Sequence, residues 1–95
     1  MTYKLEFKKS AFKEWKKLGA TLQAQFKKIL IERLTNPYVQ PDKLSGADNL
    51  YKIKLRQAGY RLVYKFEDDV LTITVIAVGK REHGKVYEQA FKRLN

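Results

Sequence analysis

Basic side chains recur at every second position in one stretch of the chain, at Lys52, Lys54 and Arg56. Successive side chains of a β-strand point to opposite faces, so this spacing places all three on one face of a sheet. The next apolar segment carries Arg61 and Lys65, which also share a face because they are four residues apart. Clustered lysine and arginine side chains can bind phosphate oxygens and stabilise the negative charge that builds up when a phosphodiester is attacked.

The turn between these two segments decides whether all five cations share one open face. If the turn holds an even number of residues, even-numbered residues of the first segment lie opposite odd-numbered residues of the second. Residues directly opposite each other share a face, so Lys54 then lies on the same face as Arg61. The same rule across the next turn predicts that the following segment points three side chains into the core, at Leu71, Ile73 and Val75. We expect the nearby carboxylates to lie in loops away from the basic face: Asp42, Asp48, Glu67, Asp68 and Asp69.

Two further residues stand where they could join the cluster. Arg81 comes after the last apolar stretch, just beyond a bend expected at Gly79, and it could reach over the sheet face or remain an ordinary surface arginine. Tyr87 opens the final amphipathic segment, where it could face the cluster or simply cover a helix edge.

The residue types exclude several other kinds of site. The chain has no cysteine, which excludes disulfides, thiol catalysis and thiolate zinc sites. It has one histidine, His83, so a pair of histidines cannot share acid and base roles. We therefore expect no metal and no cofactor, and any catalysis must come from the cations.

The hydrophobic periodicity predicts a scaffold that can position these side chains. Apolar residues alternate in some segments and recur every three or four residues in others, which indicates strands and helices of an α+β domain spanning residues 1–95. We expect a helix hairpin packed on one face of a mainly antiparallel twisted sheet. The predicted elements are a strand at 2–7, a helix capped by Ser10, a helix from 21 to Asn36, strands at 50–56, 60–66 and 70–78, and a short helix at 86–94.

The charge balance indicates the class of partner. Lys and Arg outnumber Asp and Glu by 20 to 10, and a formal charge of +10 on 95 residues is typical of proteins that bind polyanions, nucleic acid above all. The N-terminus has no uninterrupted apolar run, so we expect no signal peptide, no membrane span and a cytoplasmic protein.

The segments 51–56, 59–64, 78–82 and 86–87, together with 11–19 and 43–46, resemble the RelE family of toxin–antitoxin mRNA interferases over essentially the whole chain. The resemblance implies the RelE-like fold and a toxin that cuts mRNA in the ribosomal A site. It also implies attack by the ribose 2′-hydroxyl, which leaves a 2′,3′-cyclic phosphate and a 5′-hydroxyl. The family's catalytic residues match Lys52, Lys54, Arg61, Arg81 and Tyr87.

The resemblance also suggests partners. We expect RNA or ribosome contacts, including ribosomal RNA, from Arg56, Lys65, Lys80 and His83. A RelB-like antitoxin should bind the toxin, and operator DNA should be reached only through that complex. Two alternatives are a basic RNA- or ribosome-binding module without catalysis and a ParE-like toxin that acts on DNA gyrase. The presence of all five catalytic matches argues against both.

Overall fold

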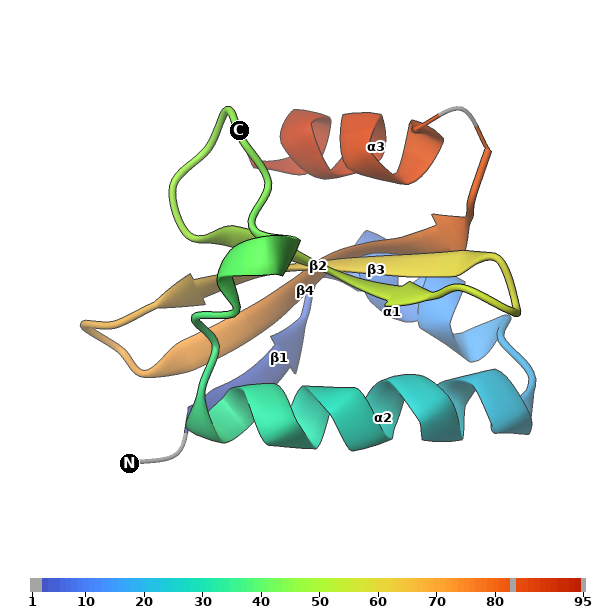
Figure 1. Ribbon diagram of the computed structural model, residues 1–95, viewed down its shortest axis with the longest axis horizontal. Coiled ribbons are helices and arrows are strands. Elements are labelled where there is room, and N and C mark those ends of the chain that lie inside the picture. Colours follow the sequence, from blue (N-terminus) through green and yellow to red (C-terminus); the bar gives the residue numbers. More distant parts are fainter. Residues whose placement is uncertain (1–2, 83, 95) are drawn as a thin grey trace.

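Four strands of the described chain form one twisted sheet: β1 (Lys4–Phe7), β2 (Leu50–Leu55), β3 (Tyr60–Glu67) and β4 (Thr72–Lys80). They lie in the order β1-β4-β3-β2 in the computed structural model, which describes residues 3–82 and 84–94 (Figure 1). β3 is antiparallel to both β2 and β4, and β1 lies parallel to β4 at the edge. The predicted α+β class with a mainly antiparallel sheet is therefore confirmed.

Helices cover both faces of this sheet. α1 (Lys9–Lys16) and α2 (Ala20–Thr35) pack on one face, and α3 (Lys85–Arg93) crosses the other (Figure 1). A short 3₁₀ helix, η1 (Gln40–Asp42), lies in the connection from α2 to β2. Within residues 3–82 and 84–94, no helix combines the length and apolar character that a bilayer crossing requires.

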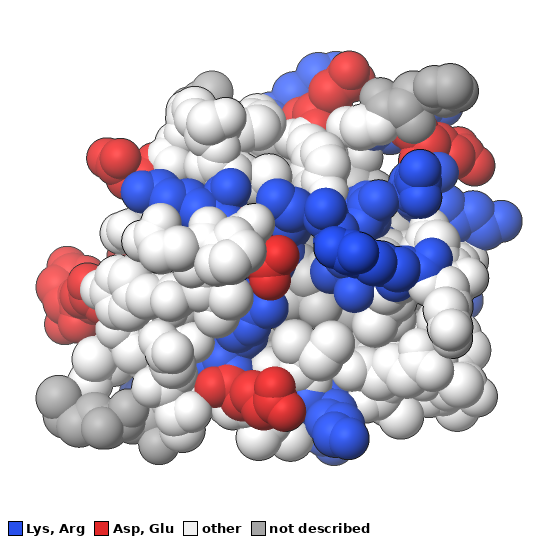
Figure 2. Space-filling model, in the orientation of Figure 1, with Lys and Arg blue, Asp and Glu red and all other residues white. Residues whose placement is uncertain are grey.

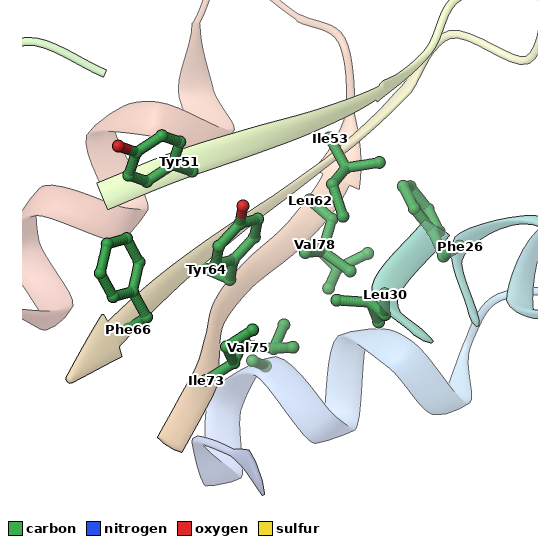
Figure 3. Close-up of a cluster of buried hydrophobic side chains, with 11 residues drawn as sticks. Phe26, Leu30, Tyr51, Ile53, Leu62, Tyr64, Phe66, Ile73, Val75 and Val78 are labelled. Atoms are coloured by element: carbon green, nitrogen blue, oxygen red, sulfur yellow. The ribbon is translucent and has the colours of Figure 1, made fainter. Parts of the chain in front are cut away.

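The larger core lies between the sheet and the first two helices. Figure 3 shows Phe26 and Leu30 of α2 on the same side of the sheet as Ile53, Leu62 and Val78, and all five are at most 3% exposed. Removing a side chain of this size from water stabilises the fold by about 1.5–3 kcal/mol. The helix predicted from position 21 is confirmed, and its buried residues are these two.

A second, smaller core lies under α3. Val86 and Ala90 of this helix pack against Leu50, Val63 and Ile76 on the face opposite to α2. The face that carries the basic residues is therefore open only in part, because α3 covers its middle. The part of the basic face that α3 leaves exposed lies at the end of the sheet where β3 begins.

Three predicted details are wrong, each for a local reason. Ser10 lies inside α1 and does not cap it, because Lys8 still donates its N–H to the Val75 carbonyl of β4 and the helix starts directly after it. Leu71 lies in the turn before β4 with φ of 46°, half-buried and outside the core. Gly79 is a regular β4 residue opposite Arg61, so no bend forms there.

The expected separation of acidic residues from the basic face is also wrong in one place. Glu67 is the last residue of β3 and not part of a loop, and its carboxylate lies 3.8 Å from the Lys65 ammonium. The strand extends one residue further than predicted because Glu67 pairs with Thr72. Lys65 therefore has a local counter-ion that the alternation pattern did not reveal.

Candidate active site

The β2–β3 hairpin sets the first three cations of the site. Lys54 lies directly opposite Arg61, and Lys52 lies opposite Val63. β2 ends at Leu55 and β3 begins at Tyr60, so the turn holds four residues, an even number. The predicted pairing of even-numbered residues of β2 with odd-numbered residues of β3 is therefore confirmed. Lys52, Lys54 and Arg61 consequently project from the same face, beyond the part that α3 covers.

A β-bulge brings the end of β4 to the same place. The register between β3 and β4 shifts at Val63/Tyr64, which turns both Ile76 and Ala77 toward α3. Beyond the last strand residue, the Arg81 backbone N–H donates a hydrogen bond of 2.6 Å to the Gly59 carbonyl in the β2–β3 turn. Arg81 is thereby fixed beside the hairpin.

The first turn of α3 supplies the remaining wall. Gly84 begins the helix in the left-handed region at φ 73°, where glycine is favoured over other residues. Val86 then packs so closely on Gly79 that a Cβ at position 79 would lie 3.1 Å from its methyl group. Tyr87, the next residue, is half-buried at the edge of the small core and faces the cations.

These elements enclose a cleft of about 630 Å³. The five predicted catalytic residues all line it, together with others: Lys52, Lys54, Arg61, Arg81 and Tyr87, with Lys80, Glu82, Gly84, Lys85 and Val86. In Figure 2 the Lys and Arg side chains form a band between α3 and α2 that is densest at the end where the β2–β3 turn lies. The structure thus joins residues from four separate segments into one positive concavity.

The crowding of cations changes the acidity of one lysine. The positive charge of Lys52 lowers the pKa of Lys54 below the ordinary lysine value, and loss of water contact and the charges of Arg61 and Arg56 lower it further. A lowered pKa makes a lysine a better proton acceptor near neutral pH. The pKa of the Tyr87 hydroxyl is raised by burial, so Tyr87 stays neutral and its ring is available for stacking.

The other predicted contact residues are divided between the cleft and its surroundings. Lys80 lines the cleft, whereas Arg56 lines a second hollow of about 590 Å³ that Lys54 also lines. Lys65 lies four residues along β3 from Arg61 and does not line the cleft. His83 lies outside the described residues.

Sequence reasoning missed two charged residues of the cleft, Glu82 and Lys85. Both belong to the connection and first turn that lead into α3, and no strand alternation signals their direction. Glu82 places a carboxylate in a site that we expected to be purely basic. Within the described residues, no group of three His, Asp or Glu side chains lies close enough together to hold a metal ion.

Comparisons with known proteins give a consistent result. Residues 5–84 match the family model of the ParE toxin of the type II toxin–antitoxin system parDE. The chain is 50% identical over 94 residues to the mRNA interferase toxin RelE of Escherichia coli K12 and to the mRNA interferase RelE of Shigella flexneri, with 99% of each chain covered.

Solved structures of the Escherichia coli toxin superimpose closely. A double mutant of RelE in the free state matches with a TM-score of 0.92 and 48% identity over 100% of both chains. RelE in the intact RelBE toxin–antitoxin complex matches with a TM-score of 0.82 and 49% identity over 85% of this chain and 99% of that chain.

Proposed function

The chain belongs to the ParE/RelE family of toxins of type II toxin–antitoxin systems, and from this membership we propose that it is an mRNA interferase of the RelE type. Its substrate is mRNA bound to the ribosome, which it cuts as an endoribonuclease in the A site. The observation that carries the proposal is the cleft in which Lys52, Lys54, Arg61, Arg81 and Tyr87 meet.

The chemistry of the cleft suits RNA because RNA carries its own nucleophile. The ribose 2′-oxygen loses its proton and attacks the adjacent phosphorus, while the bond from phosphorus to the 5′-oxygen breaks. The products are a 2′,3′-cyclic phosphate and a 5′-hydroxyl. Such a reaction needs a base, an acid that protonates the departing 5′-oxygen, and cations that stabilise the extra charge on the phosphorane, and it needs no protein nucleophile.

Each residue has a role that follows from its position. Lys54 accepts the 2′-hydroxyl proton, since its neighbours lower its pKa, and Lys52 supplies the charge that does so. Arg61, directly opposite Lys54, binds the phosphate oxygens through its planar guanidinium. Arg81 neutralises charge on the departing 5′-oxygen, which takes its proton from water because a guanidinium gives up protons reluctantly. Tyr87 stacks on a base.

The partners follow from the same proposal. The cations around the cleft contact mRNA and ribosomal RNA, and work on the ribosome places the protein in the cytoplasm. A RelB-like antitoxin binds and silences it, as the Escherichia coli RelBE complex suggests by analogy. Operator DNA is reached only through that toxin–antitoxin complex.

Mapping the cut ends on translated mRNA tests the proposal. Primer extension on programmed ribosomes should show cuts within the A-site codon, and end-group analysis should find a 2′,3′-cyclic phosphate. Because the matching family model describes the ParE toxin, DNA supercoiling by gyrase is measured in parallel. Intact mRNA together with inhibited gyrase would contradict the proposal and favour the ParE-like alternative. Intact mRNA on ribosomes that still bind the protein would favour the non-catalytic alternative.

A further inference from the structure

An ion pair joins the last turn of α3 to α1, across 79 positions of the chain. Arg93 Nη1 lies 2.8 Å from Glu14 Oε1, and Arg93 Nη2 lies 3.1 Å from Glu14 Oε2. The guanidinium thus holds the carboxylate with two parallel hydrogen bonds. The side chains are 19% and 31% exposed, so water screens this pair less than an ordinary surface pair.

The same two side chains also hold the backbone of β4. β1 covers the edge of β4 only from Thr72 to Val75, which leaves the next backbone groups without a strand partner. Glu14 Oε1 accepts the Val78 N–H at 3.1 Å, and Arg93 Nη1 donates to the Ile76 carbonyl at 2.9 Å. One network therefore links α1, the edge of β4 and the end of α3.

The rest of α3 is held by few contacts. The helix has nine residues and no side-chain cap at its start, and only Val86 and Ala90 are buried. Isolated helices of this length are unstable in water, so tertiary anchors decide where the helix lies. Besides the small core, these anchors are the Arg93 network and a hydrogen bond from the Lys8 ammonium to the Arg93 carbonyl.

Tyr87 stands on the first turn of this helix, in the wall of the cleft. Arg93 lies six positions further along the chain, which is about 9 Å along a helix axis. Because a helix moves as a rigid rod over this distance, a shift of its last turn displaces Tyr87 as well. A displacement of ~1 Å at a positioned group can cost on the order of a hundredfold in rate.

We propose that Glu14 and Arg93 are positioning residues for the cleavage reaction. Their ion pair fixes α3 on the edge of β4 and thereby holds Tyr87 at the cleft. Neither side chain lines the cleft, so their effect on the reaction passes through Tyr87. The proposal rests on the proposed function and adds residues that lie outside the cleft.

A double-mutant cycle tests whether Glu14 and Arg93 act on cleavage through Tyr87. Glu14→Gln removes the charge but keeps an acceptor for the Val78 N–H, and Arg93→Gln removes the partner. Single-turnover cleavage of mRNA on programmed ribosomes is measured for each variant, alone and combined with Tyr87→Ala. We expect each to lower the rate roughly tenfold when Tyr87 is present. In the Tyr87→Ala background the further loss should be no more than about twofold, since residues that act through one another are non-additive.

Asp68→Asn provides a matched control. This carboxylate, in the β3–β4 turn, accepts hydrogen bonds from the Tyr3 and Tyr38 hydroxyls, so its loss removes a tertiary contact that does not involve α3. Amide hydrogen exchange of residues 85–93 should accelerate in Glu14→Gln and stay unchanged in Asp68→Asn.

The outcomes separate the two proposals. Equal losses of rate with and without Tyr87 would overturn the positioning role, because a general loss of stability acts in both backgrounds. If the wild-type protein left mRNA intact, the proposed function would fail. Hydrogen exchange would still decide whether the pair holds α3: unchanged exchange in Glu14→Gln would overturn that claim as well.

Discussion

The backbone N–H of Arg81 donates a hydrogen bond to the carbonyl oxygen of Gly59, so the segment that leaves β4 is tied to the β2–β3 turn. Gly59 adopts φ of 72° in this turn, a conformation that other residues rarely adopt. The bond depends on main-chain atoms alone. The location of position 81 is therefore independent of its side chain, which is exposed to solvent.

Arg81→Ala should abolish most cleavage while leaving the fold intact. Removing one preorganised charge-stabilising group costs on the order of a hundredfold or more in rate. The same loss is expected for Arg61→Ala, whose side chain also projects into the cleft. Single-turnover cleavage on programmed ribosomes gives the rates, and thermal unfolding checks the fold. Near wild-type cleavage in either folded variant would contradict its assigned role.

Lys52→Gln should shift the pH dependence of cleavage to higher pH. Lys54 accepts a proton only in its uncharged form, and the charge of Lys52 is the largest cause of its lowered pKa. Without that charge the pKa of Lys54 rises toward the ordinary lysine value, so a higher pH is needed to deprotonate it. Single-turnover rates across pH measure the midpoint.

The midpoint of the pH profile is compared between variants, and not the rate at a single pH, because Lys52→Gln also weakens phosphate binding at every pH. Lys28→Gln, which removes an exposed lysine from α2, should leave the midpoint where it is. An unchanged midpoint in Lys52→Gln would assign the proton transfer to a group other than Lys54.

Strand alternation explains why so much of the site could be predicted. Lys52, Lys54 and Arg61 lie on regular strands joined by a short turn, and one parity rule fixes their common face. Because side chains alternate along a strand, each set of alternate residues can occupy only one of two faces. The apolar residues between the cations face the core, which places the cations on the opposite face. The resemblance to a family then predicted roles for Arg81 and Tyr87, which local patterns alone left undecided.

The remaining details depend on contacts between distant segments. The bulge opposite Val63 places two successive residues under α3, and no local signal in β4 reveals it. Glu14 and Arg93 each look like an ordinary charged residue on an amphipathic helix, and their pairing exists only because α1 and α3 meet at the edge of β4. Ser10 is a good helix cap by type, but the backbone pairing of Lys8 with β4 fixes an earlier start.

Cleavage should not depend on a divalent ion at the active site. Among the described residues, the charged side chains that line the cleft are lysines, arginines and one carboxylate, Glu82, whereas oxygen-binding ions such as Mg²⁺ usually need more acidic ligands. The cleavage rate on ribosomes kept intact by polyamines should survive excess EDTA. A ribosome-free substrate provides the control: activity restored by one particular divalent ion would contradict the metal-free mechanism.

The final prediction concerns the antitoxin. Val86 and Ala90 are the buried residues of α3, and few other anchors hold this helix, so a partner can replace it at a low cost in free energy. An amphipathic antitoxin helix could occupy the same apolar groove over Leu50, Val63 and Ile76. Displacement of α3 would carry Tyr87 away from the cleft, while acidic side chains of the partner cover the cations.

Hydrogen exchange of residues 84–94 with and without the antitoxin distinguishes this displacement from simple exclusion from the ribosome. A displaced helix loses its docking contacts, so its amides should exchange faster in the complex, whereas those of β3 and β4 should be protected at least as well as before. Steric exclusion alone would leave α3 in place, with unchanged or increased protection.

Because Glu14→Gln already weakens the anchor of α3, this variant should also bind the antitoxin more tightly than the wild type, since less free energy is spent on releasing the helix. Equal affinity together with unchanged exchange would leave only bulk exclusion as the mode of inhibition.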